Sequence, residues 1–164
     1  MSWKNPYEII DTVPIVPAGK PIVTFSSVKI DGEILYLLSH ELERTKDLIT
    51  PADVKNLSAF LIEAIDKIDA EQPTSYGLGL LGRIGRDFGR LLDCYHGYHI
   101  RAAYMLRNVS GVEVADFCIA HEDGDDRYRL VMFYWHAEAV CKYALGQEQI
   151  TRWCAFIERE HHQP

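Results

Sequence analysis

Residues 22–38, IVTFSSVKIDGEILYLL, decide the fold class of this chain. Ile22–Ile30 is rich in β-branched residues, which favour a strand, and Asp31-Gly32 is a strong signal for a tight hairpin turn. If Ile34–Leu38 returns as a second strand, the chain combines a β-hairpin with helices and is α+β. If these residues do not pair, the chain is mostly α.

A helical pattern after the turn competes with the hairpin. Four apolar residues have the spacing of one helix face: Ile34, Leu37, Leu38 and Leu42. Ser39–Asp47 is polar and contains many helix formers, so these residues predict an amphipathic helix over Glu33–Leu48, with the hairpin as the alternative.

The next segment carries the clearest helix signals in the chain. Thr50 is a typical N-cap residue, Pro51 suits the first helical position, and Asp53 lies in the first turn. The apolar residues that follow form one stripe: Val54, Leu57, Leu61, Ile65 and Ile68. These features predict a helix that ends before the breaker Gln72-Pro73.

The remaining chain alternates between helical and β-rich patterns. We predict a long helix over Leu78–Arg107 and a hairpin formed by Val112–Ala120 and Arg127–Trp135. The second run of this hairpin is apolar on both faces, so we expect it to be central in its sheet. His136–Leu145 and Gln147–His161 are predicted as closing helices.

These elements predict an α+β fold with two β-hairpins or one small antiparallel sheet packed on a helical layer. Four prolines interrupt the start of the chain: Pro6, Pro14, Pro17 and Pro21. We therefore expect residues 1–21 to be an extended proline-rich arm and residues 22–164 to be a single globular domain. No internal repeat is evident in the sequence.

Composition narrows the classes of function. The 164 residues carry a net charge of −7, which argues against a surface devoted to nucleic acid, and no apolar run is long enough to cross a membrane. The four cysteines are far apart and lie among apolar neighbours: Cys94, Cys118, Cys141 and Cys154. They indicate buried free thiols, and with no signal-peptide pattern at Met1–Pro6 we expect a soluble cytoplasmic protein.

Positive charge gathers at one place in this acidic chain. Arg83, Arg86 and Arg90 recur at helical spacing, which would place them on one face of the predicted helix near its start. Guanidinium groups beside a helix N-terminus can bind a phosphate or another anion. We expect any anionic ligand to bind at these three arginines.

Histidines follow the arginines and could transfer protons. Arg90 is followed six residues later by His96, a spacing that resembles the Arg-then-His pair of HEPN-type ribonucleases. The resemblance would imply a small helical domain, with His96 acting as acid or base near a ribose hydroxyl and Arg90 holding the phosphate. His99 is the other candidate for proton transfer.

Two functions follow from these features. The first is a binding protein that inhibits, adapts or regulates a macromolecular partner, because the chain is rich in the aromatic residues that anchor interfaces. The second is a small enzyme or sensor for a phosphate-bearing ligand at the arginine face. We favour the first, with a protein as partner and homodimerisation left open. No pattern predicts a metal site or a cofactor.

Overall fold

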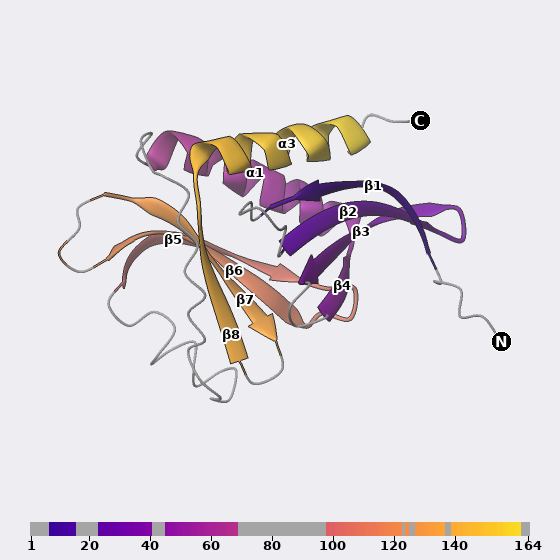
Figure 1. Cartoon of the computed structure of the whole chain (residues 1–164), viewed down its shortest axis with the longest axis horizontal. Coiled ribbons are helices and arrows are strands. Elements are labelled where there is room, and N and C mark those ends of the chain that lie inside the picture. Colours follow the sequence, from indigo (N-terminus) through magenta and orange to yellow (C-terminus); the bar gives the residue numbers. More distant parts are fainter. Residues whose placement is uncertain are drawn as a thin grey trace.

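The computed structural model describes residues 7–15, 23–40, 45–68, 98–122, 124, 127–136 and 139–161. These residues form two four-stranded antiparallel sheets and two helices, so the fold is α+β and not the mostly α alternative (Figure 1). Sheet A contains β1 (Glu8–Pro14), β2 (Val23–Ile30), β3 (Glu33–His40) and β4 (Thr45–Ile49), and α1 (Pro51–Lys67) follows it. Sheet B contains β5 (Tyr98–Arg107), β6 (Glu113–Glu122), β7 (Arg129–His136) and β8 (Ala139–Leu145), and α3 (Gln147–His161) follows it. The strands of each sheet pair in sequence order.

The hairpin alternative for residues 22–38 is the correct one. Ile30 pairs with Glu33 across Asp31 and Gly32, whose φ angles are 48° and 84°, as a two-residue turn with two left-handed residues requires. The predicted helix over Glu33–Leu48 is wrong, because these residues include β3 and most of β4. Leu37 and Leu38 are both buried although they point to opposite faces of the sheet, and this double burial imitates a helical pattern.

Two other predicted helices are also wrong where the structure describes them. The predicted long helix ends at Arg107, but Tyr98–Arg107 is β5, which pairs with β6 along its length. The helix over His136–Leu145 is replaced by the end of β7 and by β8, which pair with each other. Cross-strand pairing outweighs the local helix propensity of these segments. The first part of the long helix, residues 78–97, lies outside the described residues.

The other predicted elements are confirmed. The helix capped by Thr50 is α1, and Gln147–His161 is α3. Val112–Ala120 and Arg127–Trp135 correspond to the paired strands β6 and β7. The second run, β7, is central in sheet B as expected from its apolar sequence, and β6 is central as well. Within residues 1–21, β1 pairs with β2, and the extended arm stays a prediction for the rest of that segment.

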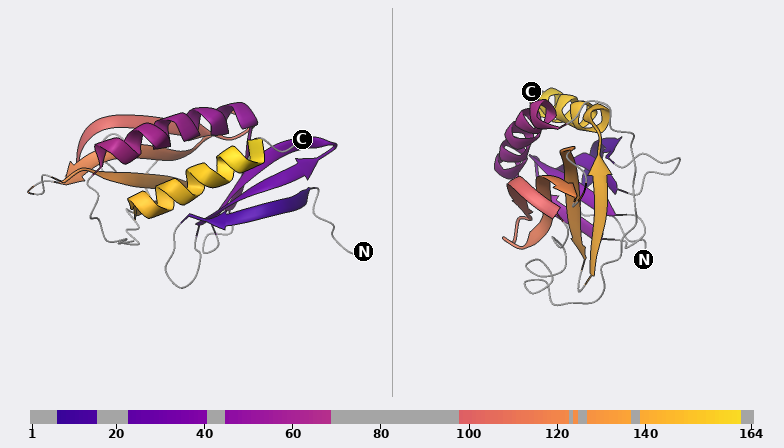
Figure 2. Two further views of the ribbon diagram at one scale, coloured as in Figure 1. Left: turned by 90° about the horizontal axis from the view of Figure 1, so that it is seen from above. Right: turned by 90° about the vertical axis from the view of Figure 1, so that its left-hand side faces the viewer.

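The two helices lie side by side and antiparallel on the same side of both sheets (Figures 1 and 2). One continuous core joins residues of both sheets and both helices. A second, smaller cluster lies on the other face of sheet B and contains Cys118, Ala120, Val131 and Phe133. The central strands of sheet B are therefore buried on both faces. Neither described helix is long and apolar enough to span a membrane.

The second half of the chain repeats the first, which the sequence analysis did not detect. Among the described residues, each half has four antiparallel strands followed by a helix, and the third strand and the helix begin 96 residues apart, at Glu33 and Arg129 and at Pro51 and Gln147. Four helix positions are buried in both halves: Val54 and Ile150, Leu57 and Trp153, Leu61 and Ile157, Ala64 and Glu160. The helices also share an Ala-Phe dipeptide at this spacing. These matches identify a structural repeat.

Each helix also contacts the sheet of the other half. On α1, the Phe60 ring lies 5.9 Å from Tyr104 of β5, and the Tyr104 hydroxyl donates to the Asp53 carbonyl at 3.2 Å. On α3, the Trp153 ring lies 5.3 Å from Phe25 of β2 and 5.6 Å from Phe117 of β6. These contacts across the two halves join them into one core.

The start of each helix has one of the two hydrogen bonds that make up a capping box, and the two helices differ in which one they have. At α1, the Thr50 hydroxyl accepts from the Asp53 backbone N–H at 3.3 Å. At α3, the Gln149 side-chain carbonyl accepts from the Gly146 backbone N–H at 2.8 Å. Either contact satisfies a donor that a helix start otherwise leaves exposed, so both helices begin directly after the last strand of their half.

Candidate functional site

An open groove of about 550 Å³ runs between the outer faces of α1 and α3. Seven residues line it: Lys55, Ser58, Ala59 and Ile62 from α1, and Cys154, Ile157 and Glu158 from α3. Ile157 is fully buried and belongs to the core, whereas the Ile62 side chain remains 55% exposed. The groove therefore combines an apolar floor with an exposed apolar side chain on one wall.

Two charges of opposite sign stand at the groove. Lys55 on α1 and Glu158 on α3 have no ion-pair partner within the part of the chain that the structure describes. Elsewhere on the same helices, Glu63 pairs with Lys67 at 3.9 Å and Glu148 pairs with Arg152 at 2.9 Å. The groove is thus flanked by one positive and one negative charge that are available to a partner.

The thiol in the groove is not suited to nucleophilic chemistry. Burial raises the pKa of Cys154 from 9.0 to about 11, and the Glu158 carboxylate adds to the rise, while a hydrogen bond from Ser58 opposes it. The thiolate is the reactive form, so a thiol with this pKa stays protonated at neutral pH. Cys118 and Cys154 are free thiols, as the sequence predicts; Cys118 is buried as expected, whereas Cys154 is only partly buried.

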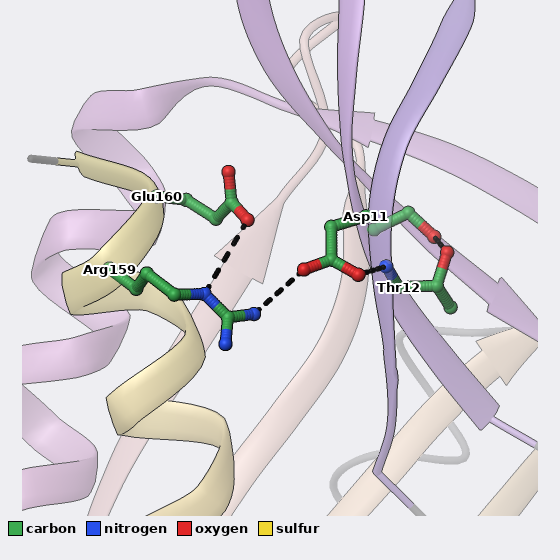
Figure 3. Close-up of polar contacts among 5 residues, drawn as sticks. Asp11, Thr12, Arg159 and Glu160 are labelled. Atoms are coloured by element: carbon green, nitrogen blue, oxygen red, sulfur yellow. Dashed lines mark hydrogen bonds and ion pairs between the residues drawn. The ribbon is translucent and has the colours of Figure 1, made fainter. Parts of the chain in front are cut away.

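A polar contact ties the end of α3 to β1 (Figure 3). Arg159 Nη2 lies 2.8 Å from Asp11 Oδ2, and Arg159 Nε lies 3.9 Å from Glu160 Oε1. The Glu160 side chain is only 3% exposed, and Oε1 accepts no hydrogen bond within the described residues. Glu160 is thus a buried carboxylate at the position where α1 has Ala64.

Polar side chains also connect the two sheets in the interior. His40 Nε2 on β3 hydrogen-bonds the Tyr143 hydroxyl on β8, and both side chains are buried. The Tyr134 hydroxyl on β7 donates to Asp47 Oδ2 on β4 at 3.2 Å, and Asn108 Nδ2 donates to Asp47 Oδ1 at 3.4 Å. These contacts are closed to solvent at His40 and Tyr143, so we assign them to joining the sheets.

His99 is the one predicted site residue that the described ranges include. It lies on β5 directly opposite His121 of β6, with the ring centroids 4.7 Å apart and the planes inclined by 20°. Tyr128 contacts His121 edge-on at 5.0 Å, and the Arg101 guanidinium lies 5.5 Å from the Tyr128 ring centre. His99 therefore belongs to a cluster of rings on sheet B and not to a helix.

The other predicted site residues, Arg83, Arg86, Arg90 and His96, lie outside the described residues. Their arrangement stays a prediction, including the spacing that resembles HEPN-type ribonucleases. The eight described strands differ from the small helical domain that the resemblance implies.

The groove was not predicted from the sequence. One signal was present, because Ile62 is an apolar residue that falls outside the predicted stripe of α1. The contribution of α3 could not be inferred, since only the packing of the two helices brings Cys154, Ile157 and Glu158 to the same place.

No protein-family model, curated protein or solved structure matches the chain.

Proposed function

We propose that the protein acts by binding another protein and that the groove between α1 and α3 is the docking surface. The exposed Ile62 beside this apolar groove is the observation that carries the proposal. The protonated Cys154 thiol supports binding over covalent catalysis at this place. An apolar centre surrounded by a polar rim is the arrangement that protein interfaces typically have.

The occupant that fits best is an amphipathic helix of the partner protein. A groove between two helices can receive the apolar face of a third helix, whose anchors recur every three or four residues. Lys55 and Glu158 favour a helix with an acidic side chain near α1 and a basic one near α3. Such a pair of charges would fix the orientation of the bound helix.

Site-specific crosslinking in the native host tests this proposal. A photo-crosslinking residue at position 62 should capture one partner protein, and the captured segment should be an amphipathic helix. The same residue at position 34, which is an exposed isoleucine on β3, serves as the control site and should not capture that partner.

The identified helix should then be measured against groove variants. We expect Ile62→Glu to weaken its affinity at least tenfold, which corresponds to about 1.4 kcal/mol, and Ile34→Glu to leave it unchanged. Lys55→Glu should weaken binding, and replacing the acidic residue of the partner helix with a basic one should restore it. Capture of a second copy of this chain, or a partner indifferent to Ile62→Glu, would overturn the proposal.

A further inference from the structure

The stacked pair His99 and His121 has a geometry that its place in the sheet determines. The two residues are opposite each other on antiparallel strands, so their side chains project from the same face. Directly opposite residues have Cβ atoms about 4.5–5.5 Å apart, which matches the ring separation of 4.7 Å. His99 is exposed and His121 is half-buried, so the pair is accessible from solvent.

We propose that His99 and His121 bind one divalent transition-metal ion, such as Zn²⁺, Ni²⁺ or Cu²⁺. Imidazole nitrogen is a preferred ligand for these ions, and each metal–nitrogen bond is about 2.0–2.1 Å long. Two such ligands on one ion bring their nitrogens to roughly 3 Å, as tetrahedral or square-planar geometry requires. With the ring centroids 4.7 Å apart, rotation of the two rings about their side-chain bonds would bring one nitrogen of each to that separation.

The surroundings hold the histidines in place without closing the site. Tyr128 packs against the core and meets His121 edge-on, which fixes the position of that ring. Each imidazole has two nitrogens, so one can coordinate while the other makes the hydrogen bond that orients many histidine ligands.

The pair is an open metal site. Among the described residues, no group of three His, Cys, Asp or Glu side chains is placed to hold an ion. Two protein ligands therefore leave at least two positions of a four-coordinate ion to water or to a donor atom from a ligand.

Arg101 provides a way to distinguish this proposal from an anion site. Its guanidinium lies against Tyr128, which in turn contacts His121, and its positive charge opposes a metal cation. Arg101→Gln should therefore strengthen metal binding. If the cluster binds anions instead, the same change should weaken phosphate binding and leave metal affinity unimproved.

Calorimetry with Zn²⁺ alone and electron paramagnetic resonance with Cu²⁺ test the site. His161 and His162 are adjacent in the sequence and could bind metal themselves, so the protein should carry His161→Ala and His162→Ala throughout. We expect one ion per chain, a Cu²⁺ spectrum with two coordinated imidazoles, and at least a tenfold loss of affinity in His99→Ala and in His121→Gln. Tyr128→Phe keeps the ring and serves as the matched control.

The proposal fails if this protein binds no metal, or if His99→Ala leaves the affinity unchanged while circular dichroism shows an intact fold. It also fails if Arg101→Gln weakens phosphate binding and does not raise metal affinity. The metal site and the helical groove use different residues, so neither result depends on the other.

Discussion

The two halves of the molecule have the same order of strands and helix, but their helices have different side chains at matched buried positions. At one matched pair of positions α1 has Leu57 and α3 has Trp153, and at another α1 has Ala64 and α3 has Glu160. The Trp153 ring reaches both Phe25 and Phe117, which belong to different sheets. The comparison shows that α3 carries both the larger apolar anchor and the one buried carboxylate among these matched positions.

Truncating the two matched anchors should give the largest effect. Trp153→Ala should destabilise the protein by about 4 kcal/mol and Leu57→Ala by about 3 kcal/mol, because the larger side chain leaves the larger cavity. Urea denaturation measured by circular dichroism would give both free energies of unfolding. If Leu57→Ala costs as much as Trp153→Ala, the difference between the helices that we describe has no energetic consequence.

Replacing the buried carboxylate should have a smaller effect of the opposite sign. Glu160→Met removes a charge that is held by one ion pair of 3.9 Å, and we expect it to stabilise the fold by about 1 kcal/mol. Thermal and urea denaturation would measure the change. The exposed Glu158→Met on the same helix is the control and should change stability by less than about 0.5 kcal/mol.

A loss of stability in Glu160→Met would contradict this expectation. It would mean that the carboxylate makes a favourable interaction that Arg159 alone does not account for. The Glu160 carboxylate would then stabilise the fold at the position where α1 has Ala64.

The smallest effect should come from the matched pair Ser58 and Cys154, and only in alkaline solution. Because burial raises the pKa of the Cys154 thiol to about 11, the unfolded chain, with a thiol pKa near 9.0, loses this proton first as pH rises. The contribution of the thiol to folding is therefore complete below about pH 9 and is lost as pH rises towards 11.

Cys154→Ser gives α3 the residue that α1 has at this position and removes the ionisation. The decline of the free energy of unfolding between pH 9 and 11 should become shallower, as urea titrations at several pH values would show. Burial, and after it the Glu160 charge, raise the pKa of Tyr36 from 10.0 to about 12. Part of the decline above pH 10 should therefore remain in Cys154→Ser. An unchanged pH profile in Cys154→Ser would show that the thiol is not responsible.

The sequence predicted those elements whose signals are local. Thr50, Pro51 and Asp53 sufficed to place the start of α1. Asp31-Gly32 marked the turn after β2, although a helix was favoured for the residues that follow it. Such signals depend on backbone geometry within a few residues, so distant parts of the chain cannot overrule them easily.

The elements that were predicted wrongly depend on distant partners. Leu37 and Leu38 of β3 are both buried because each face of this central strand is covered, and the alternation that marks a strand is lost. Tyr98–Arg107 has helix-forming residues but pairs with β6. The same dependence hid both candidate sites, since the groove needs two helices and His99 meets His121 only through the register of the sheet.

Each helix packs on both halves, so the chain resembles a dimer whose two copies share their helices and have been joined end to end. Neither half can bury the apolar face of its sheet with its own helix alone, since Phe25 relies on α3 and Tyr104 relies on α1. Damage to one helix therefore uncovers the opposite half. The molecule should lose its structure in a single cooperative transition, and two separately produced halves should regain the fold only after mixing.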